Sequence, residues 1–123
     1  MDNHTIYGQR ILSRSPRLSM AADIALNHHE KWDGSGYPSG KRQDEIPLSA
    51  RIVQMADIYD ALRADLPCKP ALDHARARDI ILLGVERIDS AGHFDPTLIE
   101  AFADTHRKFD EIFQAFVDNS AAR

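Results

Sequence analysis

The chain has 123 residues, of which 43% are hydrophobic and 28% charged, a composition typical of one globular domain and not of a disordered segment. No apolar run approaches the roughly 20 residues that span a bilayer, the N-terminus has no secretion signal, and the single cysteine excludes an internal disulfide framework, so we expect a cytoplasmic protein without a membrane segment. The net charge is −4 with its excess in residues 70–123, and no basic cluster exceeds the pair Lys41–Arg42, which argues against binding to a nucleic-acid polymer.

Apolar residues recur at spacings of three and four along most of the chain, which is the pattern of amphipathic helices. No stretch alternates with a period of two, so we expect no sheet and an all-α fold. The pattern predicts five helices, over residues 3–12, 19–31, 48–64, 72–86 and 96–118.

Polar residues and breakers mark the ends of these helices. Asn3 and Asp73 are candidate N-caps, and Asp95 precedes a proline that suits the first helical turn. Gly92 is expected to break the chain before the last helix. The candidate core residues of the fourth helix are Ile80, Ile81, Leu83 and Val85, and the apolar stripe of the last helix comprises Leu98, Phe102, Phe109, Ile112, Phe113 and Phe116.

Residues 32–47 interrupt the helical pattern. They read WDGSGYPSGKRQDEIP, with three glycines and two prolines, which predicts an irregular loop. His28 and His29 come just before it, in the predicted last turn of the second helix. Adjacent helical side chains point about 100° apart, so both reach one metal ion only if the ion lies between their directions near the helix end. The alternative is that both are ordinary surface or core histidines.

Two aspartates on the third helix are the other candidate ligands. Asp57 and Asp60 are three positions apart, so we expect them on the same side of the helix. Asp57 has apolar neighbours in the sequence, and its carboxylate needs a partner, which is either a metal or, more simply, a cap or solvent.

His4 is the third candidate histidine. Gly8 follows it one turn later and would let another helix approach closely. Three histidines and a carboxylate suit a divalent iron, manganese, zinc or nickel ion. We expect the remaining histidines, His74, His93 and His106, on the surface.

Residues 28–62 resemble the signature stretch of the HD-GYP family, and they read HHEKWDGSGYPSGKRQDEIPLSARIVQMADIYDAL. This family comprises bacterial metal-dependent phosphodiesterases that hydrolyse cyclic di-GMP. The resemblance extends to HTIYGQRIL at the front, to LPCKPA in place of the family's RPYK segment, and to GHFDP before the last helix. It covers about residues 4–117 and implies that residues 1–123 form part of an HD-domain-like helical bundle.

The resemblance implies a role for each matching residue. The counterparts of the ligands of an iron or manganese centre are His4, His28, His29 and Asp57. The counterparts of residues at the nucleotide site are Gly36, Tyr37 and Pro38 of the GYP triplet, together with Asp60 and Lys69. In some members the GYP loop also contacts GGDEF-type cyclase domains, so such a domain is an expected partner.

Two departures from the family pattern bear on activity. The His-Asp dipeptide that gives the family its name does not occur in this sequence. Without that pair a two-metal mechanism cannot be assembled from one copy. Leu66 replaces the arginine of RPYK and Cys68 its tyrosine, which removes a bidentate phosphate contact.

The resemblance therefore leads to two readings. The first is part of a cyclic di-GMP phosphodiesterase that is not catalytic as this chain alone. The alternative is a module that binds cyclic di-GMP or a cyclase domain without turnover. We also expect a homodimer, because we expect apolar faces that include Phe102, Phe109, Phe113 and Phe116 to be left uncovered.

Overall fold

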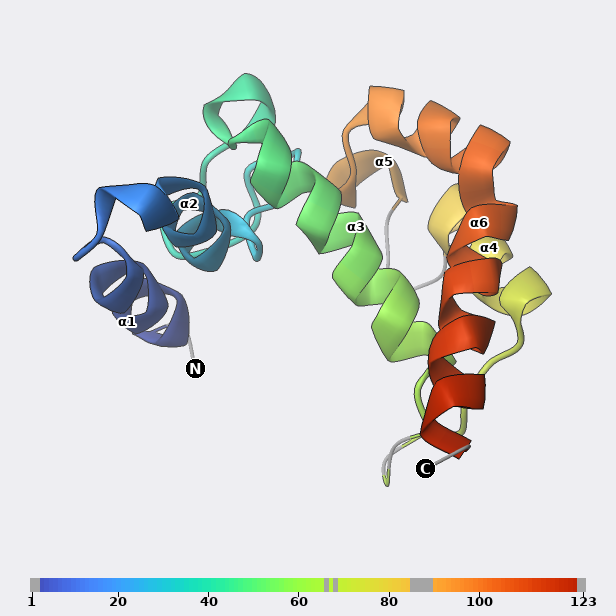
Figure 1. Cartoon of the computed structure of the whole chain (residues 1–123). Helices are drawn as coiled ribbons and strands as arrows, with labels where there is room; N and C mark the ends of the chain where they lie inside the picture. The colour runs from blue at the N-terminus through green and yellow to red at the C-terminus, as the bar shows by residue number, and fades with distance from the viewer. Residues whose placement is uncertain (1–2, 66, 68, 85–89, 122–123) are drawn as a thin grey trace.

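The structure is a computed structural model that describes residues 3–65, 67, 69–84 and 90–121 (Figure 1). These residues form helices and no strand, which confirms the all-α prediction. In the described part the elements are α1 (Asn3–Leu12), η1 (Pro16–Leu18), α2 (Ser19–Asn27), η2 (Gln43–Glu45), α3 (Leu48–Arg63), α4 (His74–Leu83), α5 (Ser90–His93) and α6 (Pro96–Ala121). α5 is the helix that the sequence did not predict.

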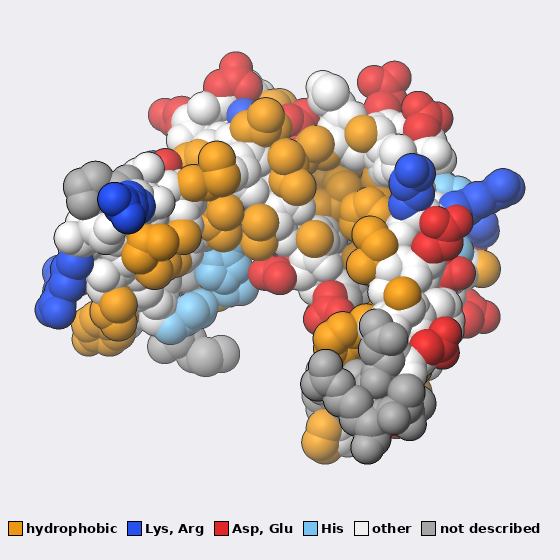
Figure 2. Space-filling model, viewed as in Figure 1, with side chains coloured by type: hydrophobic (Ala, Val, Ile, Leu, Met, Phe, Trp, Pro, Cys, Tyr) orange, Lys and Arg blue, Asp and Glu red, His pale blue; other side chains and the backbone are white. Residues whose placement is uncertain are grey.

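The helices form two groups, α1 with α2 and α4 with α6, and the long helix α3 connects them (Figure 1). α1 packs on α2, and α2 contacts the first half of α3. α4 contacts the second half of α3 and also α6. Figure 2 shows that apolar side chains gather along the hollow between the two groups, while most acidic side chains lie around the outer edge of this face.

Gly8 allows the close approach of α1 to α2. A Cβ atom at Gly8 would lie 3.3 Å from Cβ of Ala25, which is tighter than ordinary van der Waals contact. The predicted close approach of a second helix at Gly8 is therefore confirmed. It brings the N-terminal turn of α1, with His4, beside the end of α2.

The core lies where α3, α4 and α6 meet. Its fully buried members are Met55, Tyr59, Ala77, Ile81, Phe94 and Phe102. Burial of each large apolar side chain contributes about 1.5–3 kcal/mol to folding. Two predicted core residues, Ile80 and Ile81, are buried, whereas Leu83 is 80% exposed because α4 ends there and turns that side chain away. Val85 lies outside the described residues.

The ends of the later helices are capped as expected, with one exception. The Asp73 carboxylate accepts the Arg76 N–H at 2.9 Å, and the Asp95 carboxylate accepts the Thr97 N–H at 2.9 Å. Gly92 does not break the chain, because it is buried inside α5. Asn3 is the first residue of α1.

A hydrogen-bonded chain of polar side chains crosses the core. Nη1 of Arg63 donates to the Tyr59 hydroxyl at 2.6 Å and to Asp110 at 2.8 Å. The Tyr59 hydroxyl lies 3.0 Å from Nδ1 of His74, whose Nε2 lies 2.9 Å from Nδ1 of His106. The expectation that His74 and His106 are surface residues was wrong, because both are half-buried where α4 meets α6.

Candidate metal centre

The two adjacent histidines follow α2 instead of belonging to its last turn. The helix ends at Asn27, and His28 is its C-cap residue, with its N–H bonded to the Ile24 carbonyl at 3.0 Å. Asn27 closes the helix because its side-chain amide donates to the Asp23 carbonyl at 2.8 Å, and its own carbonyl accepts the Glu30 N–H. The predicted second helix, over 19–31, was therefore four residues too long.

Three histidines converge at this turn. One ligand nitrogen from each of His4, His28 and His29 lies within 4.8 Å of the others. His4 comes from α1, and the other two come from the end of α2. The ring centroids of His4 and His29 are 5.0 Å apart, and those of His28 and His29 are 4.1 Å apart.

The chemistry of these side chains fits a divalent transition metal. The Ile24 carbonyl lies 2.9 Å from Nδ1 of His28, so this nitrogen carries the proton and Nε2 keeps its lone pair. Metal-binding histidines usually donate their second ring N–H to a carbonyl or carboxylate in this way. Burial lowers the pKa of His29, and the neighbouring His28 and His4 lower it further, while Asp57 raises it. The lowered pKa keeps His29 in the neutral form that binds metals.

Asp57 lies beside this cluster. It lines a pocket of about 320 Å³ together with His28, His29 and Tyr37. Its carboxylate is exposed and does not belong to the group of three ligand nitrogens within 4.8 Å. Its assignment as a metal ligand stays a prediction.

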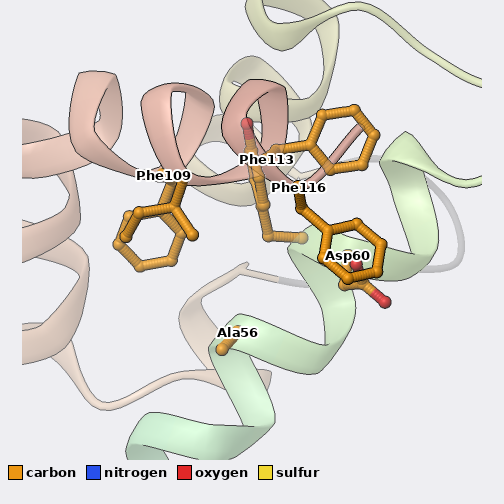
Figure 3. Close-up of a pocket in the computed structure, with 7 residues that line it drawn as sticks. Ala56, Asp60, Phe109, Phe113 and Phe116 are labelled. Carbon is orange, nitrogen blue, oxygen red and sulfur yellow. The ribbon is translucent and has the colours of Figure 1, made fainter. Parts of the chain in front are cut away.

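Asp60 lies in a different hollow. It lines a groove of about 430 Å³ between α3 and α6, with aromatic residues of α6 (Figure 3). The prediction that Asp57 and Asp60 share one side of the helix was wrong in this sense, because positions three apart still differ by about 60° around the axis. That difference is enough to place them on opposite sides of one ridge of α3.

The loop after the histidines is held close to them by Gly36. A Cβ atom at Gly36 would lie 2.3 Å from the His29 carbonyl oxygen and 2.6 Å from Cα of Glu30, so only glycine fits. The next residue, Tyr37, donates its N–H to the same carbonyl at 3.2 Å. Its ring stacks on His29 with centroids 5.0 Å apart, and Pro38 follows it.

Glu30 anchors the second half of this loop. Its side chain is 1% exposed, and its carboxylate accepts the backbone N–H groups of Ser39, Gly40 and Lys41 at 3.2, 2.9 and 2.8 Å. The Gln54 amide, from α3, donates to the Glu30 carbonyl. Sequence reasoning assigned no role to Glu30 or Gln54. Glu30 directly follows His28 and His29 in the sequence. Its role becomes clear only from the backbone N–H groups that its carboxylate accepts.

His93 also lines the pocket, although the sequence placed it on the surface. Its side chain is half-buried, and its backbone carbonyl accepts the Trp32 N–H at 3.2 Å. This bond brings α5 against the start of the loop, so the surface prediction was wrong.

Lys69 lies at the other end of α3. Its ammonium group donates to the Leu62 and Ala64 carbonyls at 3.3 and 2.8 Å, where it caps the C-terminus of α3. It does not line the histidine pocket. Leu66 and Cys68, the two departures from the family segment, lie outside the described residues.

Comparison with known proteins gives the following matches. The HD domain family matches residues 1–98. A probable cyclic di-GMP phosphodiesterase of Vibrio cholerae is 42% identical over 130 residues, which cover 99% of this chain and 28% of that protein. A cyclic di-GMP phosphodiesterase of Thermotoga maritima is 39% identical over 125 residues, which cover 99% of this chain and 32% of that protein.

A third relative differs in its named substrate. It is the 3'3'-cGAMP-specific phosphodiesterase 2 of Vibrio cholerae, 38% identical over 120 residues, which cover 96% of this chain and 22% of that protein. The chain thus spans less than a third of the length of these relatives. In the part of the chain that the structure describes, no helix has the length and apolarity needed to cross a membrane.

Proposed function

Because this chain belongs to the HD-domain family, we propose that it carries the histidine-rich metal site of a phosphodiesterase that hydrolyses cyclic di-GMP. The observation that supports this most directly is the convergence of His4, His28 and His29, of which His28 and His29 line a pocket. The proposed fourth ligand is Asp57, whose carboxylate lines that pocket.

We propose iron or manganese as the metal, with zinc or nickel as alternatives. A divalent ion at this site supplies Lewis-acid charge for a phosphate oxygen. The protein supplies the orientation: the Ile24 carbonyl fixes the ring of His28, and Tyr37 covers His29. We propose that the Tyr37 ring, which lines the pocket, contacts a nucleotide base. Gly36 and Pro38 shape the loop that carries Tyr37. We also propose that Asp60 and Lys69 contact the substrate, although neither lines the histidine pocket.

We propose further that the 123-residue chain alone binds the dinucleotide without hydrolysing it. The sequence lacks the His-Asp pair that bridges metals in the family, so the second metal has too few ligands. A binding role, toward cyclic di-GMP or a GGDEF-type cyclase domain, is thus the second candidate function. The single cysteine supports a cytoplasmic location for either role.

Metal analysis of the purified chain tests the site. We expect bound iron or manganese in the wild type and its loss in His4→Ala and His28→Ala, measured by elemental analysis after dialysis. The matched control is His106→Gln, which changes a histidine in the core of the α4–α6 contact and should keep the metal. A wild-type metal content of zero would overturn the site.

Chromatography of nucleotides tests the activity. We expect the metal-loaded chain to bind cyclic di-GMP in titration calorimetry and to leave it intact over hours of incubation. 3'3'-cGAMP is the comparison ligand, since one relative is specific for it. Rapid hydrolysis by the isolated chain would contradict the binding role, and absence of binding to both dinucleotides would contradict the proposed function.

A further inference from the structure

The backbone of α5 is fixed against the loop that follows the metal histidines. The Asp33 N–H donates to the Gly92 carbonyl at 2.9 Å, and the Trp32 N–H donates to the His93 carbonyl at 3.2 Å. Gly92 and Phe94, on either side of His93, are both buried. The position of His93 is therefore determined by the fold and not by a free loop.

A buried ion pair holds the next turn to α3. Nη1 of Arg51 lies 2.6 Å from Oδ2 of Asp95, and these side chains are only 15% and 7% exposed. Nε of Arg51 donates to the Ile46 carbonyl, so the same guanidinium also holds the end of the loop. Charge-assisted bonds of this kind are short and directional. These bonds hold α3 to the end of the loop at Ile46 and to Asp95, which follows α5.

His93 faces the same pocket as the metal histidines but is not one of them. The pocket is lined by His28 and His29 as well as His93, whereas the described residues whose ligand atoms cluster within 4.8 Å do not include His93. It therefore stands apart from the proposed metal, within the same cavity.

Few charged side chains line the pocket. Lys31 also lines it, and among the described lining residues Asp57 is the one acidic side chain. Asp33 lies near both side chains, because its pKa is lowered chiefly by hydrogen bonds from Ser35 and further by His93 and Lys31. The Lys31 ammonium group offers an anionic ligand a charged partner in this pocket.

We infer that His93 is a substrate-binding residue that donates a hydrogen bond from its imidazole to a phosphate oxygen of the bound cyclic dinucleotide. This inference rests on the proposed function of the site and adds to it a residue of the pocket that is not among the proposed metal ligands. Phosphate oxygens accept strong hydrogen bonds from charged or polarised N–H donors. No bond of the substrate is made or broken by this contact.

Calorimetry on the metal-loaded full chain tests the inference with cyclic di-GMP as the probe. We expect His93→Ala to weaken dinucleotide binding at least about tenfold, which corresponds to the loss of one hydrogen bond to a charged group. His93→Gln keeps an N–H donor and should restore part of the affinity. Both variants should bind as much metal as the wild type, whereas His28→Ala should lose it.

A second measurement does not depend on affinity. The imidazole ¹H–¹⁵N signals of His93, assigned by their absence in His93→Gln, should shift when cyclic di-GMP is added to the zinc-loaded chain. Circular dichroism of His93→Gln checks that α5 and the fold are retained.

The outcomes separate the two proposals. Unchanged affinity in His93→Ala with full metal content overturns the role of His93 and leaves the proposed function standing. Loss of metal in both His93 variants also overturns it, because His93 would then act on the metal. Failure of the metal-loaded wild type to bind either dinucleotide overturns the proposed function and this inference together.

Discussion

At the scale of single residues, Gly36 sets the distance between the loop and the histidines. Any side chain there meets the backbone of His29 and Glu30 at 2.3–2.6 Å, and backbone atoms cannot turn aside as a flexible side chain can. We expect Gly36→Ala to push the loop away, to separate Tyr37 from His29, and to lower metal affinity at least about tenfold. Competition with a chelating dye measures the metal affinity of the variant.

The matched control for this variant is Ser39→Ala in the same loop. The Ser39 side chain is exposed, and the loop uses only its backbone N–H. Its metal affinity should equal that of the wild type. Equal affinities for Gly36→Ala and Ser39→Ala would show that the loop does not position the site.

Glu30 is the second residue whose effect can be stated in advance. Glu30→Gln leaves one acceptor oxygen and places an amide N–H₂ where a backbone N–H now donates, so a buried donor loses its partner. We expect the free energy of unfolding to fall by about 2–3 kcal/mol. Urea denaturation of the metal-free chain measures this.

Glu45→Gln is the control for Glu30. Glu45 is exposed and accepts a single backbone N–H, from Arg42, at 3.0 Å. Its replacement should cost less than about 1 kcal/mol. Similar losses for the two variants would contradict an anchoring role for Glu30.

At the scale of helices, the polar chain between α3, α4 and α6 makes their packing depend on pH. Arg63 donates to the Tyr59 oxygen, and in neutral His74 Nδ1 can accept the Tyr59 O–H while Nε2–H donates to His106. This arrangement requires neutral His74. The pKa of His74 is lowered from 6.5, chiefly by burial, with Asp110 opposing and His106, Arg63 and Arg78 lowering it further.

The sign of the pH effect follows from this direction. Between the lowered pKa and 6.5 the unfolded chain binds more protons than the folded chain, so stability is present above 6.5 and is lost as the pH falls. We expect metal-free wild type to be less stable at pH 5.5 than at pH 7.5, and His74→Gln to show a smaller difference. Urea midpoints at the two pH values measure this, and identical differences would contradict it. Because the pKa of His29 is also lowered, some dependence should remain in the variant.

Helix positions were largely predictable because apolar spacing records which face of each helix is buried. The sequence predicted residues 3–12 as a helix, and α1 has those bounds. It missed α5, whose four residues are too short for periodicity and are held by backbone bonds from Trp32 and Asp33. It also missed the pairing of His74 with His106, which are 32 positions apart.

The candidate site was predictable to the extent that it is local. His28, His29 and the loop are contiguous, and His4 was found through Gly8. Gln54 and His93 reach the site from α3 and α5, and nothing in their own sequence neighbourhood shows which segment they contact. Long-range contacts of this kind depend on how the helices pack.

At the scale of the whole molecule, an apolar groove lies open between α3 and α6. Ile112 and Phe116 on α6 are 71% and 70% exposed and line the groove against α3 (Figure 3). The expectation of an uncovered side chain is confirmed for Phe116, whereas Phe102 is buried and Phe109 and Phe113 are partly buried against the core. We propose a homodimer that covers this groove.

Sedimentation equilibrium tests the dimer at micromolar concentration. We expect the wild type to be dimeric and Phe116→Ser to shift toward the monomer, because the substitution removes apolar area from the groove. The control is Leu83→Ser, which changes an equally exposed residue on α4 and should leave the assembly unchanged. A monomeric wild type would contradict the proposed dimer.

The exposure of α3 on two sides has a mechanical consequence. Gln54 and Asp57 line the metal pocket, whereas Ala56 and Asp60 line the aromatic groove, and all four lie within two turns of one helix. Successive residues of an α-helix lie about 100° apart around its axis. When the helix rotates, all of its side chains move together. A rotation of α3 about its own axis that narrows the histidine pocket must therefore also change the shape of the aromatic groove.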